Sequence, residues 1–388
     1  MMKVLMIRIE PFPYGNASSS RALNLARLFA FAGNEVTVIA PVISTDRVYN
    51  HKLMDEENIS VYSSNGERDI ANAVNTILKN GDFDLIIRSA NIRLYDEIEK
   101  AIISANKGIP TILDSVEWYN ASNWRFEHFD PRYYKFLLYW RFVFPKKEGI
   151  IAISRMIESY YNRFSSNVVR IPTITDCSNT GYRTEDECSN THRIRLIFAG
   201  SLDRGKDSIK NMLLAWSELG EQKSIFAFDI FGPTKKEVEK HLGSYKRILK
   251  NDNIVIHGKT DQQVVQKACM ESDFSFFFRK QRRSSNTGFP TKLGECMSVG
   301  TPVICNNTGD IGLVVKNRIN GFLVETDSVE DIKESLFFIL NMSCKERDTM
   351  RKQARISAGL FFDYRNYKTQ INQVINRIKE QCNSKEEI

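Results

Sequence analysis

RKQRRSSNTGFPTKLGECMSVGTPVICNNTGDIGLVVKNRINGFLVE, residues 279–325, is the stretch that decides how this 388-residue chain folds. It runs from a basic loop through Gly288-Phe289-Pro290 into a helical pattern over Thr291–Val299, and then turns into the apolar strand Val303–Cys305. A glycine loop that opens a helix behind a strand presents backbone N–H groups and the positive helix end to an anion. The segment therefore predicts a site for a phosphate-bearing ligand, although an ordinary loop and helix cap would give the same local pattern.

Glu295 falls one turn inside this predicted helix, where its carboxylate can accept hydrogen bonds from sugar hydroxyls. The run GFPTKLGE, followed by GTPVI, resembles the donor-sugar signature of retaining nucleotide-sugar glycosyltransferases with the GT-B fold, especially the bacterial polysaccharide enzymes of family four. The resemblance implies that Glu295 holds the ribose hydroxyls and that the neighbouring backbone lines the diphosphate and the donor sugar. The donor-binding residues that it implies in this segment are Thr287, Gly288, Phe289, Pro290, Thr291, Lys292 and Glu295.

The chain departs from the family pattern at Thr287. The family usually carries a glutamate eight positions before the first one, where it contacts the donor sugar, and here that position is a threonine. A hydroxyl can still hydrogen-bond a sugar but carries no charge. The departure therefore leaves the identity of the donor sugar open.

Length and charge limit the class of protein. The chain can bury two cores, and its composition, with 42% hydrophobic and 26% charged residues, is typical of a globular protein. A net charge of +7 suits an acidic partner such as a nucleotide diphosphate, an anionic membrane surface or a nucleic acid. Because no RNA-binding signature, zinc-finger spacing or basic zipper occurs, we expect no nucleic-acid partner.

The N-terminus reads MMKVLMIRIEPFPYG, with charges inside its apolar stretch where a signal peptide has none. No apolar run approaches the roughly 20 residues that span a bilayer. We therefore expect a cytoplasmic protein.

Apolar strands alternate with helical patterns through both halves of the chain, which is typical of parallel sheets covered on both faces. The sequence predicts an α/β protein with two Rossmann-like domains, separated by a Ser/Thr/Asn-rich linker. The family resemblance implies the GT-B arrangement, in which the two domains face each other across a cleft and the final helix crosses back to the N-terminal domain. The predicted boundaries are 1–172 for the acceptor domain, 173–191 for the linker, 192–360 for the donor domain and 361–388 for the returning helix.

A second candidate loop, GSLDRGKDS, covers residues 200–208. Backbone N–H groups of Gly200 and Ser201 could meet a diphosphate there. Arg204 and Lys206 could neutralise it and stabilise charge on the leaving group. The loop is similar to the family's second diphosphate-binding loop, with Lys206 matching its lysine; the alternative is a pair of solvated charges beside a helix cap.

Three further candidates lie at strand ends. Arg279 ends the predicted strand Phe274–Arg279, which points into the donor site. Gly15 lies in a loop similar to the family's acceptor-side loop, although the serines after it could simply cap a helix. Glu117, in DSVEWY, follows another strand and could orient an acceptor hydroxyl or serve the fold alone.

Together these residues predict a retaining hexosyltransferase that acts in surface or capsular polysaccharide assembly. Its catalytic residues would be Lys206, Glu117 and Glu295, and its acceptor a saccharide or lipid-linked saccharide. Without a DxD-type run, we expect no metal and no cofactor besides the nucleotide-sugar substrate. The alternatives are a nucleotide-sugar epimerase, which would need acid/base residues near the sugar, and a non-catalytic nucleotide-binding module, which would favour a GxGxxG turn.

Large aromatic residues alternate with basic residues between Trp124 and Arg155. Such a pattern on one helix suits the headgroup layer of an anionic membrane, and it would attach the protein peripherally to the inner membrane face. The alternative is that the aromatic residues face the domain core and the bases face solvent.

Overall fold

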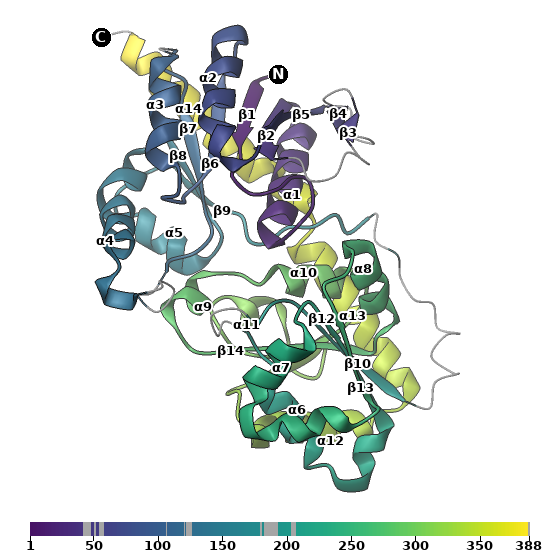
Figure 1. The fold of residues 1–388 in the computed structure, drawn as a ribbon. Helices are drawn as coiled ribbons and strands as arrows, with labels where there is room; N and C mark the ends of the chain where they lie inside the picture. Colours follow the sequence, from purple (N-terminus) through teal and green to yellow (C-terminus); the bar gives the residue numbers. More distant parts are fainter. Residues whose placement is uncertain are drawn as a thin grey trace. The chain divides into compact units, whose positions relative to one another are not determined.

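A computed structural model describes residues 1–41, 48–49, 52–53, 58–105, 107–119, 121, 126–178, 181, 193–202 and 207–386. The chain forms two compact units (Figure 1). Unit 1 comprises Met1–Thr175, Thr287–Phe289 and Tyr364–Ile388, whereas unit 2 comprises Asp176–Asn286 and Pro290–Asp363.

Unit 1 is built on a nine-stranded sheet with the order β3-β4-β5-β2-β1-β6-β7-β8-β9 among the described residues. From β5 to β9 every neighbouring pair is parallel, and the short strands β3 and β4 add antiparallel pairs at one edge. The strands are β1 (Lys3–Ile7), β2 (Glu35–Pro41), β3 (Val48–Tyr49), β4 (Lys52–Leu53), β5 (Ile59–Ser64), β6 (Leu85–Ser89), β7 (Thr111–Ser115), β8 (Gly149–Ala152) and β9 (Val168–Arg170).

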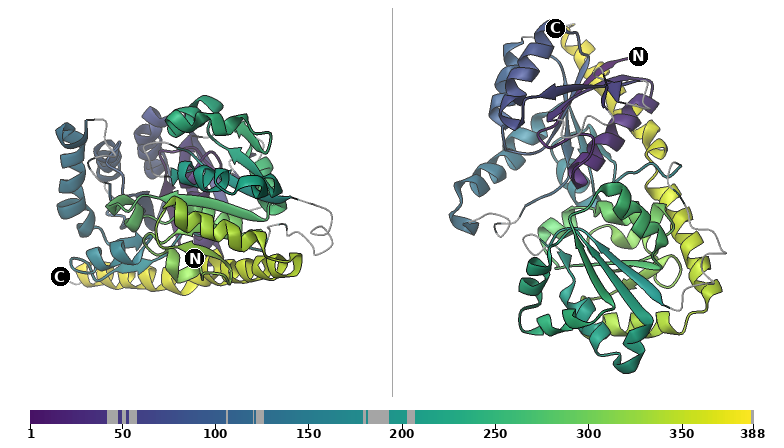
Figure 2. Two further views of the ribbon diagram at one scale, coloured as in Figure 1. Left: turned by 90° about the horizontal axis from the view of Figure 1, so that it is seen from below. Right: turned by 45° about the vertical axis from the view of Figure 1, so that its right-hand side comes forward.

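Both faces of this sheet are apolar because helices cover both of them (Figures 1 and 2). In β1, Val4 and Met6 join the core under α1 and α14, whereas Leu5 and Ile7 join the core under α2 and α3. Successive side chains of a strand point to opposite faces, which explains the unbroken apolar run. The helices are α1 (Ala17–Phe31), α2 (Ile70–Asn80), α3 (Tyr95–Ser104), α4 (Pro131–Leu138), α5 (Arg155–Tyr161) and α14 (Lys368–Glu386).

The last helix belongs to unit 1, as predicted. Ile371, Val374, Ile375 and Ile378 of α14 are buried in the unit 1 core at the spacing of one helix face. The amide of Asn167 also donates to the Val374 carbonyl (3.3 Å). The apolar face of α14 therefore completes the cover of the first sheet.

Unit 2 has a parallel sheet with the order β13-β12-β10-β14-β15-β16, and β11 pairs antiparallel with β14. Its core is rich in phenylalanine, with Phe198 and Phe228 both in ring contact with Phe276. The strands are β10 (Ile194–Ala199), β11 (Asp207–Ser208), β12 (Phe226–Phe231), β13 (Ile254–Gly258), β14 (Phe274–Arg279), β15 (Val303–Asn306) and β16 (Gly321–Val324).

Helices again cover both faces of the unit 2 sheet (Figure 2). The segment before Gly288, which the sequence predicts as a loop, contains a short helix, α9. The unit 2 helices are α6 (Lys210–Ser217), α7 (Lys235–Leu242), α8 (Gln262–Glu271), α9 (Arg283–Thr287), α10 (Thr291–Ser298), α11 (Ile311–Val314), α12 (Val329–Leu340) and α13 (Cys344–Phe361).

Candidate functional site

The loop that begins at Gly200 and the segment that begins after Arg279 leave the unit 2 sheet from the carboxyl ends of β10 and β14. The strands are parallel neighbours, so both end at the same edge of the sheet, where ligands of open α/β sheets bind. After the loop that begins at Gly200, β11 runs back along the end of β14, pairing Asp207 with Arg279 and Ser208 with Phe278. Arg204 and Lys206 themselves lie outside the described residues.

The backbone of Gly200 lies against that of Gly232. Its N–H donates to the Phe231 carbonyl (3.1 Å). Gly232, with φ of 105°, follows that strand, and a Cβ placed on it would lie 2.1 Å from the Gly200 carbonyl oxygen. Only glycine fits at position 232, because both the backbone angle and the close approach exclude a side chain. Ser201, the next residue of the loop, is exposed.

Arg279 is held at the end of β14 by the side chain of Asn306. The Arg279 N–H donates to Asn306 Oδ1 (2.8 Å), and Asn306 Nδ2 donates to the Arg279 carbonyl (2.7 Å). Asn306 is itself buried and ends β15, so its amide ties two strand ends together. An amide that clamps a neighbouring strand has no local signature in the sequence.

Helix α10 has one buried face and one face that is partly open. Leu293, Cys296 and Met297 are buried, whereas the predicted donor residues Thr291, Lys292 and Glu295 are half-buried. Thr291 and Lys292 are both neighbours of Glu295 on the helix surface, because they precede it by four and three residues. Pro290 is the N-cap, and the Lys292 ammonium lies 4.8 Å from the Phe198 ring centroid and 5.6 Å from that of Phe277.

Thr287, Gly288 and Phe289 are buried and group with unit 1, so the GFPTKLGE run is divided between the two units after Phe289. The Thr287 hydroxyl accepts from the Trp118 N–H (3.1 Å), and its carbonyl accepts from the Ser154 hydroxyl (2.6 Å). Both partners follow strands of the first sheet. The residue that stands in place of the family's glutamate is therefore anchored in the unit 1 core.

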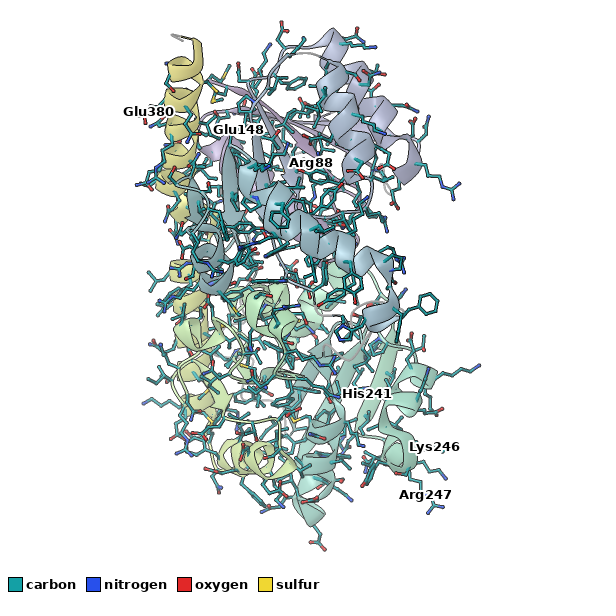
Figure 3. All side chains as sticks on the ribbon, turned by 90° about the vertical axis from the view of Figure 1, so that its left-hand side faces the viewer. Arg88, Glu148, His241, Lys246, Arg247 and Glu380 are labelled. Carbon is teal, nitrogen blue, oxygen red and sulfur yellow. The ribbon has the colours of Figure 1, made fainter. Side chains whose placement is uncertain are left out.

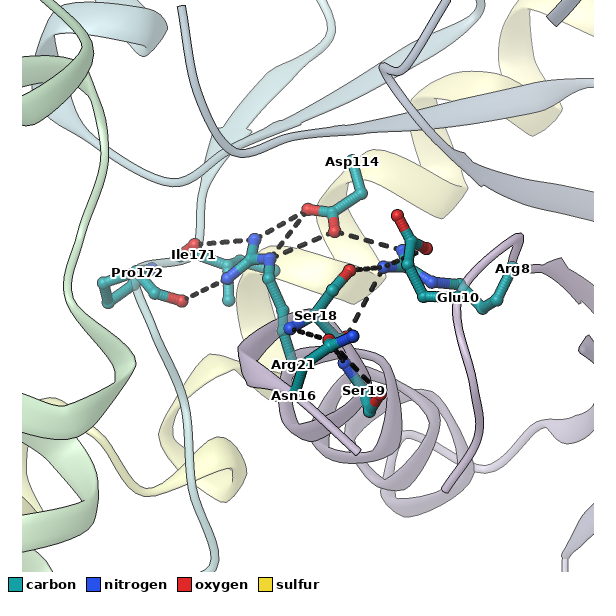
Figure 4. A network of polar contacts seen from close by, with 9 residues as sticks. All are labelled: Arg8, Glu10, Asn16, Ser18, Ser19, Arg21, Asp114, Ile171 and Pro172. Atoms are coloured by element: carbon teal, nitrogen blue, oxygen red, sulfur yellow. Dashed lines mark hydrogen bonds and ion pairs between the residues drawn. The ribbon is translucent and has the colours of Figure 1, made fainter. Parts of the chain in front are cut away.

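A buried ionic network lies at the strand ends of unit 1 (Figure 4). Asp114 is fully buried at the end of β7 and accepts from Arg21 Nε (3.0 Å) and Nη2 (2.7 Å). Arg8 approaches the same carboxylate (3.7 Å) and donates to the Ser18 hydroxyl (2.6 Å). Two buried cations and one buried carboxylate thus tie α1 and the loop before it to the sheet. The sequence analysis missed this network.

The loop that contains Gly15 is shaped by short side chains. Asn16 caps α1 by accepting from the N–H groups of Ser18 and Ser19, and the Ser19 hydroxyl donates to the Pro11 carbonyl (2.6 Å). Gly15 itself has φ of 141° and is exposed. The cap of α1 is therefore Asn16 and not one of the serines, and the Gly15 backbone is exposed to solvent.

Glu117 is half-buried two residues beyond the end of β7. The adjacent Trp118 stacks on Trp140 with ring centroids 5.1 Å apart, which fixes the chain at this point.

The imidazole of His257 in unit 2 interacts with two neighbouring side chains. Its Nε2 pairs with Asp229 (2.7 Å), and its ring stacks on Phe231. Across the described residues, no group of three or more His, Cys, Asp or Glu side chains is placed to hold a metal ion.

The region that contains α10 and the strand-end loops is similar to a known protein family. Residues 185–357 match the family described as Glycosyl transferases group 1. This region of the chain belongs to the group 1 glycosyltransferases. The resemblance drawn from the GFPTKLGE motif is confirmed, and so is the prediction of a glycosyltransferase at the level of the family.

Curated relatives match a short part of the chain. The human GDP-Man:Man(3)GlcNAc(2)-PP-Dol alpha-1,2-mannosyltransferase is 38% identical over 82 residues, which are 20% of this chain and 16% of the human protein. The mouse protein of the same name is 37% identical over 82 residues. The matched segment thus spans about a sixth of the length of these relatives.

Solved structures of glycosyltransferases match nearly the whole chain. Sucrose-phosphate synthase from Thermosynechococcus elongatus superposes with a TM-score of 0.72 at 13% identity, over 98% of this chain and 100% of that one. The Anabaena protein HepE in complex with UDP and glucose gives 0.70 at 15% identity, over 97% and 100%. WaaG, a lipopolysaccharide glycosyltransferase, gives 0.66 at 14%, over 96% and 98%. The predicted GT-B fold with two Rossmann-like domains is confirmed.

Proposed function

We propose that the protein transfers a sugar from a nucleotide-diphosphate donor to an acceptor hydroxyl, with retention of anomeric configuration, in the assembly of a surface polysaccharide. The observation that carries the proposal is the half-buried face of α10, in a region that matches the group 1 family, with Arg279 held at the end of β14 in the same unit. The solved neighbours HepE, in complex with UDP and glucose, and WaaG support a nucleotide-sugar donor and a polysaccharide role.

Each donor residue has a distinct part in this proposal. The Glu295 carboxylate accepts hydrogen bonds from the ribose hydroxyls, and the first turn of α10 directs N–H groups at the diphosphate. Lys206, Arg204 and Arg279 supply positive charge for the diphosphate as it leaves. The backbone of Gly200 and Ser201 approaches the phosphates closely, since Gly232 keeps the turn free of side chains.

For the reaction we propose front-face substitution, in which the departing β-phosphate oxygen takes the proton of the acceptor hydroxyl. The glycosidic bond to the donor breaks while the acceptor oxygen bonds to the anomeric carbon from the same face. Glu117 orients the acceptor hydroxyl, and Gly15 lets the loop backbone approach the substrate. Lys206 stabilises charge on the leaving diphosphate without a metal ion.

No observation favours the two alternatives. An epimerase needs free acid/base residues near the sugar, and His257 is instead paired with Asp229 and stacked on Phe231. The proposed acceptor is a saccharide or a lipid-linked saccharide.

Among the described residues, no helix is long and apolar enough to cross a membrane.

A panel of nucleotide diphosphates tests the proposal. Calorimetric titration with UDP, GDP, ADP and TDP should show that one base binds clearly more tightly than the others. The matching nucleotide sugars should then be hydrolysed slowly without acceptor, releasing that same diphosphate. If none of the four binds and no donor sugar is turned over, the proposed function is wrong.

A further inference from the structure

The helical segment that begins with α4 has two apolar faces. It continues from α4 through a π-helical turn (Tyr139–Val143) into a 3-10 turn (Phe144–Lys146). The inner face is buried and packs against rings of unit 1, including those of Trp118, Tyr160 and Tyr161. Its members are Tyr133, Phe136, Trp140 and Phe144.

The outer face exposes a second set of large apolar side chains. Tyr134, Leu138 and Phe142 are 51%, 56% and 58% exposed, and Phe129, just before α4, is 91% exposed. The first three follow one another at intervals of four residues, so they form a stripe along one side of the helix. Single exposed apolar residues are common, but a contiguous stripe marks an interaction surface.

Uncompensated positive charge borders this stripe. Arg141 and Arg163 lie against the half-exposed ring of Phe164, at 4.7 Å and 5.7 Å from its centroid. Lys146 is exposed one turn beyond Phe142. Within the described parts of the chain, no carboxylate pairs with these three cations.

Other bases of the same segment are neutralised locally. Lys135 bonds to Asp96 (2.7 Å), which raises the pKa of its ammonium and lowers the pKa of the Asp96 carboxyl. Lys147 pairs with Glu99, and Arg132 with Asp130. Positive charge without an acidic partner is therefore concentrated beside Leu138, Phe142 and Phe164.

We propose that this outer face docks on an anionic lipid bilayer. The face consists of Phe129, Tyr134, Leu138, Phe142 and Phe164 with Arg141, Lys146 and Arg163, and we call it the α4 face. Helix α4 lies at the margin of unit 1 (Figures 1 and 2). Rings and a leucine projecting from a helix can enter the headgroup layer, while long basic side chains reach lipid phosphates.

A bilayer fits the α4 face better than a protein partner does. A protein interface requires a matching shape, whereas a fluid bilayer accommodates a convex row of apolar side chains. The net charge of +7 adds long-range attraction to an anionic surface. The inference stands apart from the proposed function, because it rests on unit 1 alone.

Vesicle co-sedimentation of the full chain tests it. The wild type should bind vesicles of phosphatidylcholine mixed with phosphatidylglycerol, and it should bind vesicles of phosphatidylcholine alone weakly. High salt should reduce binding to the anionic vesicles to the level seen with phosphatidylcholine alone. The double variants Leu138→Ser/Phe142→Ser and Arg141→Glu/Lys146→Glu should each weaken binding about tenfold or more. All four side chains are exposed, so the fold and nucleotide affinity should stay unchanged.

Control variants make changes of the same kind at other sites. Ile103→Ser alters an exposed apolar residue on α3, and Lys246→Glu/Arg247→Glu alters exposed bases that project from unit 2 (Figure 3). Both should bind vesicles within about twofold of wild type. The proposal is overturned if wild type shows no salt-sensitive binding to anionic vesicles, or if the controls lose as much binding as the α4-face variants. Self-association through this face, without vesicle binding, would overturn it as well.

Discussion

Both units end their parallel strands in loops with charged residues, but the charges have different surroundings. In unit 1, Asp114, Arg8 and Arg21 are buried, and both arginines pair with the Asp114 carboxylate. In unit 2, Lys292 and Glu295 are half-buried on the open face of α10. The first set holds a loop in place, whereas the second set lies on the helix face that we propose as part of the donor site.

The largest expected effect comes from breaking the unit 1 network. Asp114→Ala leaves Arg21 and Arg8 buried without their shared carboxylate, which should lower the free energy of unfolding by about 3–5 kcal/mol. Denaturant unfolding followed by circular dichroism measures this. Glu97→Ala, at an exposed position on α3, is the control and should change stability by less than about 0.5 kcal/mol. Equal denaturant midpoints for the two variants would show that the Asp114 carboxylate does not stabilise the fold.

A smaller effect should follow from filling the glycine turn of unit 2. Gly232→Ala forces a Cβ towards the Gly200 carbonyl at a backbone angle that alanine disfavours, so it should cost about 1–3 kcal/mol of stability. It should also weaken nucleotide binding. Gly258→Ala is a close control, because that glycine has φ of 70° but nothing within 4 Å of its added Cβ. If the two variants bind nucleotide equally well, the close approach at Gly200 does not shape the site.

The smallest effect expected is that of a chelator. Positive side chains and helix N-termini can meet the phosphate charge, so turnover of the donor sugar should be unchanged in excess chelator. The assay is donor hydrolysis or transfer before and after chelation. Loss of turnover that Mg²⁺ or Mn²⁺ restores would contradict the metal-free proposal.

Sequence patterns predicted α10 and the strands that precede and follow it, β14 and β15, because strand and helix periods are local properties. The helix α13 was missed although it begins with a local signal, the Ser343/Glu346 capping box. The partners of Arg21 could not be predicted, since Asp114 lies 93 residues away. The contact of Thr287 with Trp118, 169 residues away, was hidden for the same reason.

The aromatic residues around α4 allowed two interpretations of the sequence, a membrane-facing helix and a helix that packs its rings into the core. Residues 133, 136, 140 and 144 face the core, and residues 134, 138 and 142 face solvent, so two stripes interleave in one stretch of sequence. Each alternative in the sequence analysis describes one stripe. Only the positions of the surrounding elements decide which residues belong to which stripe.

The most direct test of nucleotide binding by unit 2 is calorimetric titration of the preferred nucleotide diphosphate into Glu295→Ala. Loss of a charged hydrogen-bond partner costs about 1.5–3 kcal/mol, so affinity should fall about ten- to a hundredfold while the fold is kept. Glu334→Ala, which removes an exposed carboxylate from α12 of the same unit, should bind like wild type. Wild-type affinity in Glu295→Ala would contradict the assignment of the α10 face as the donor site.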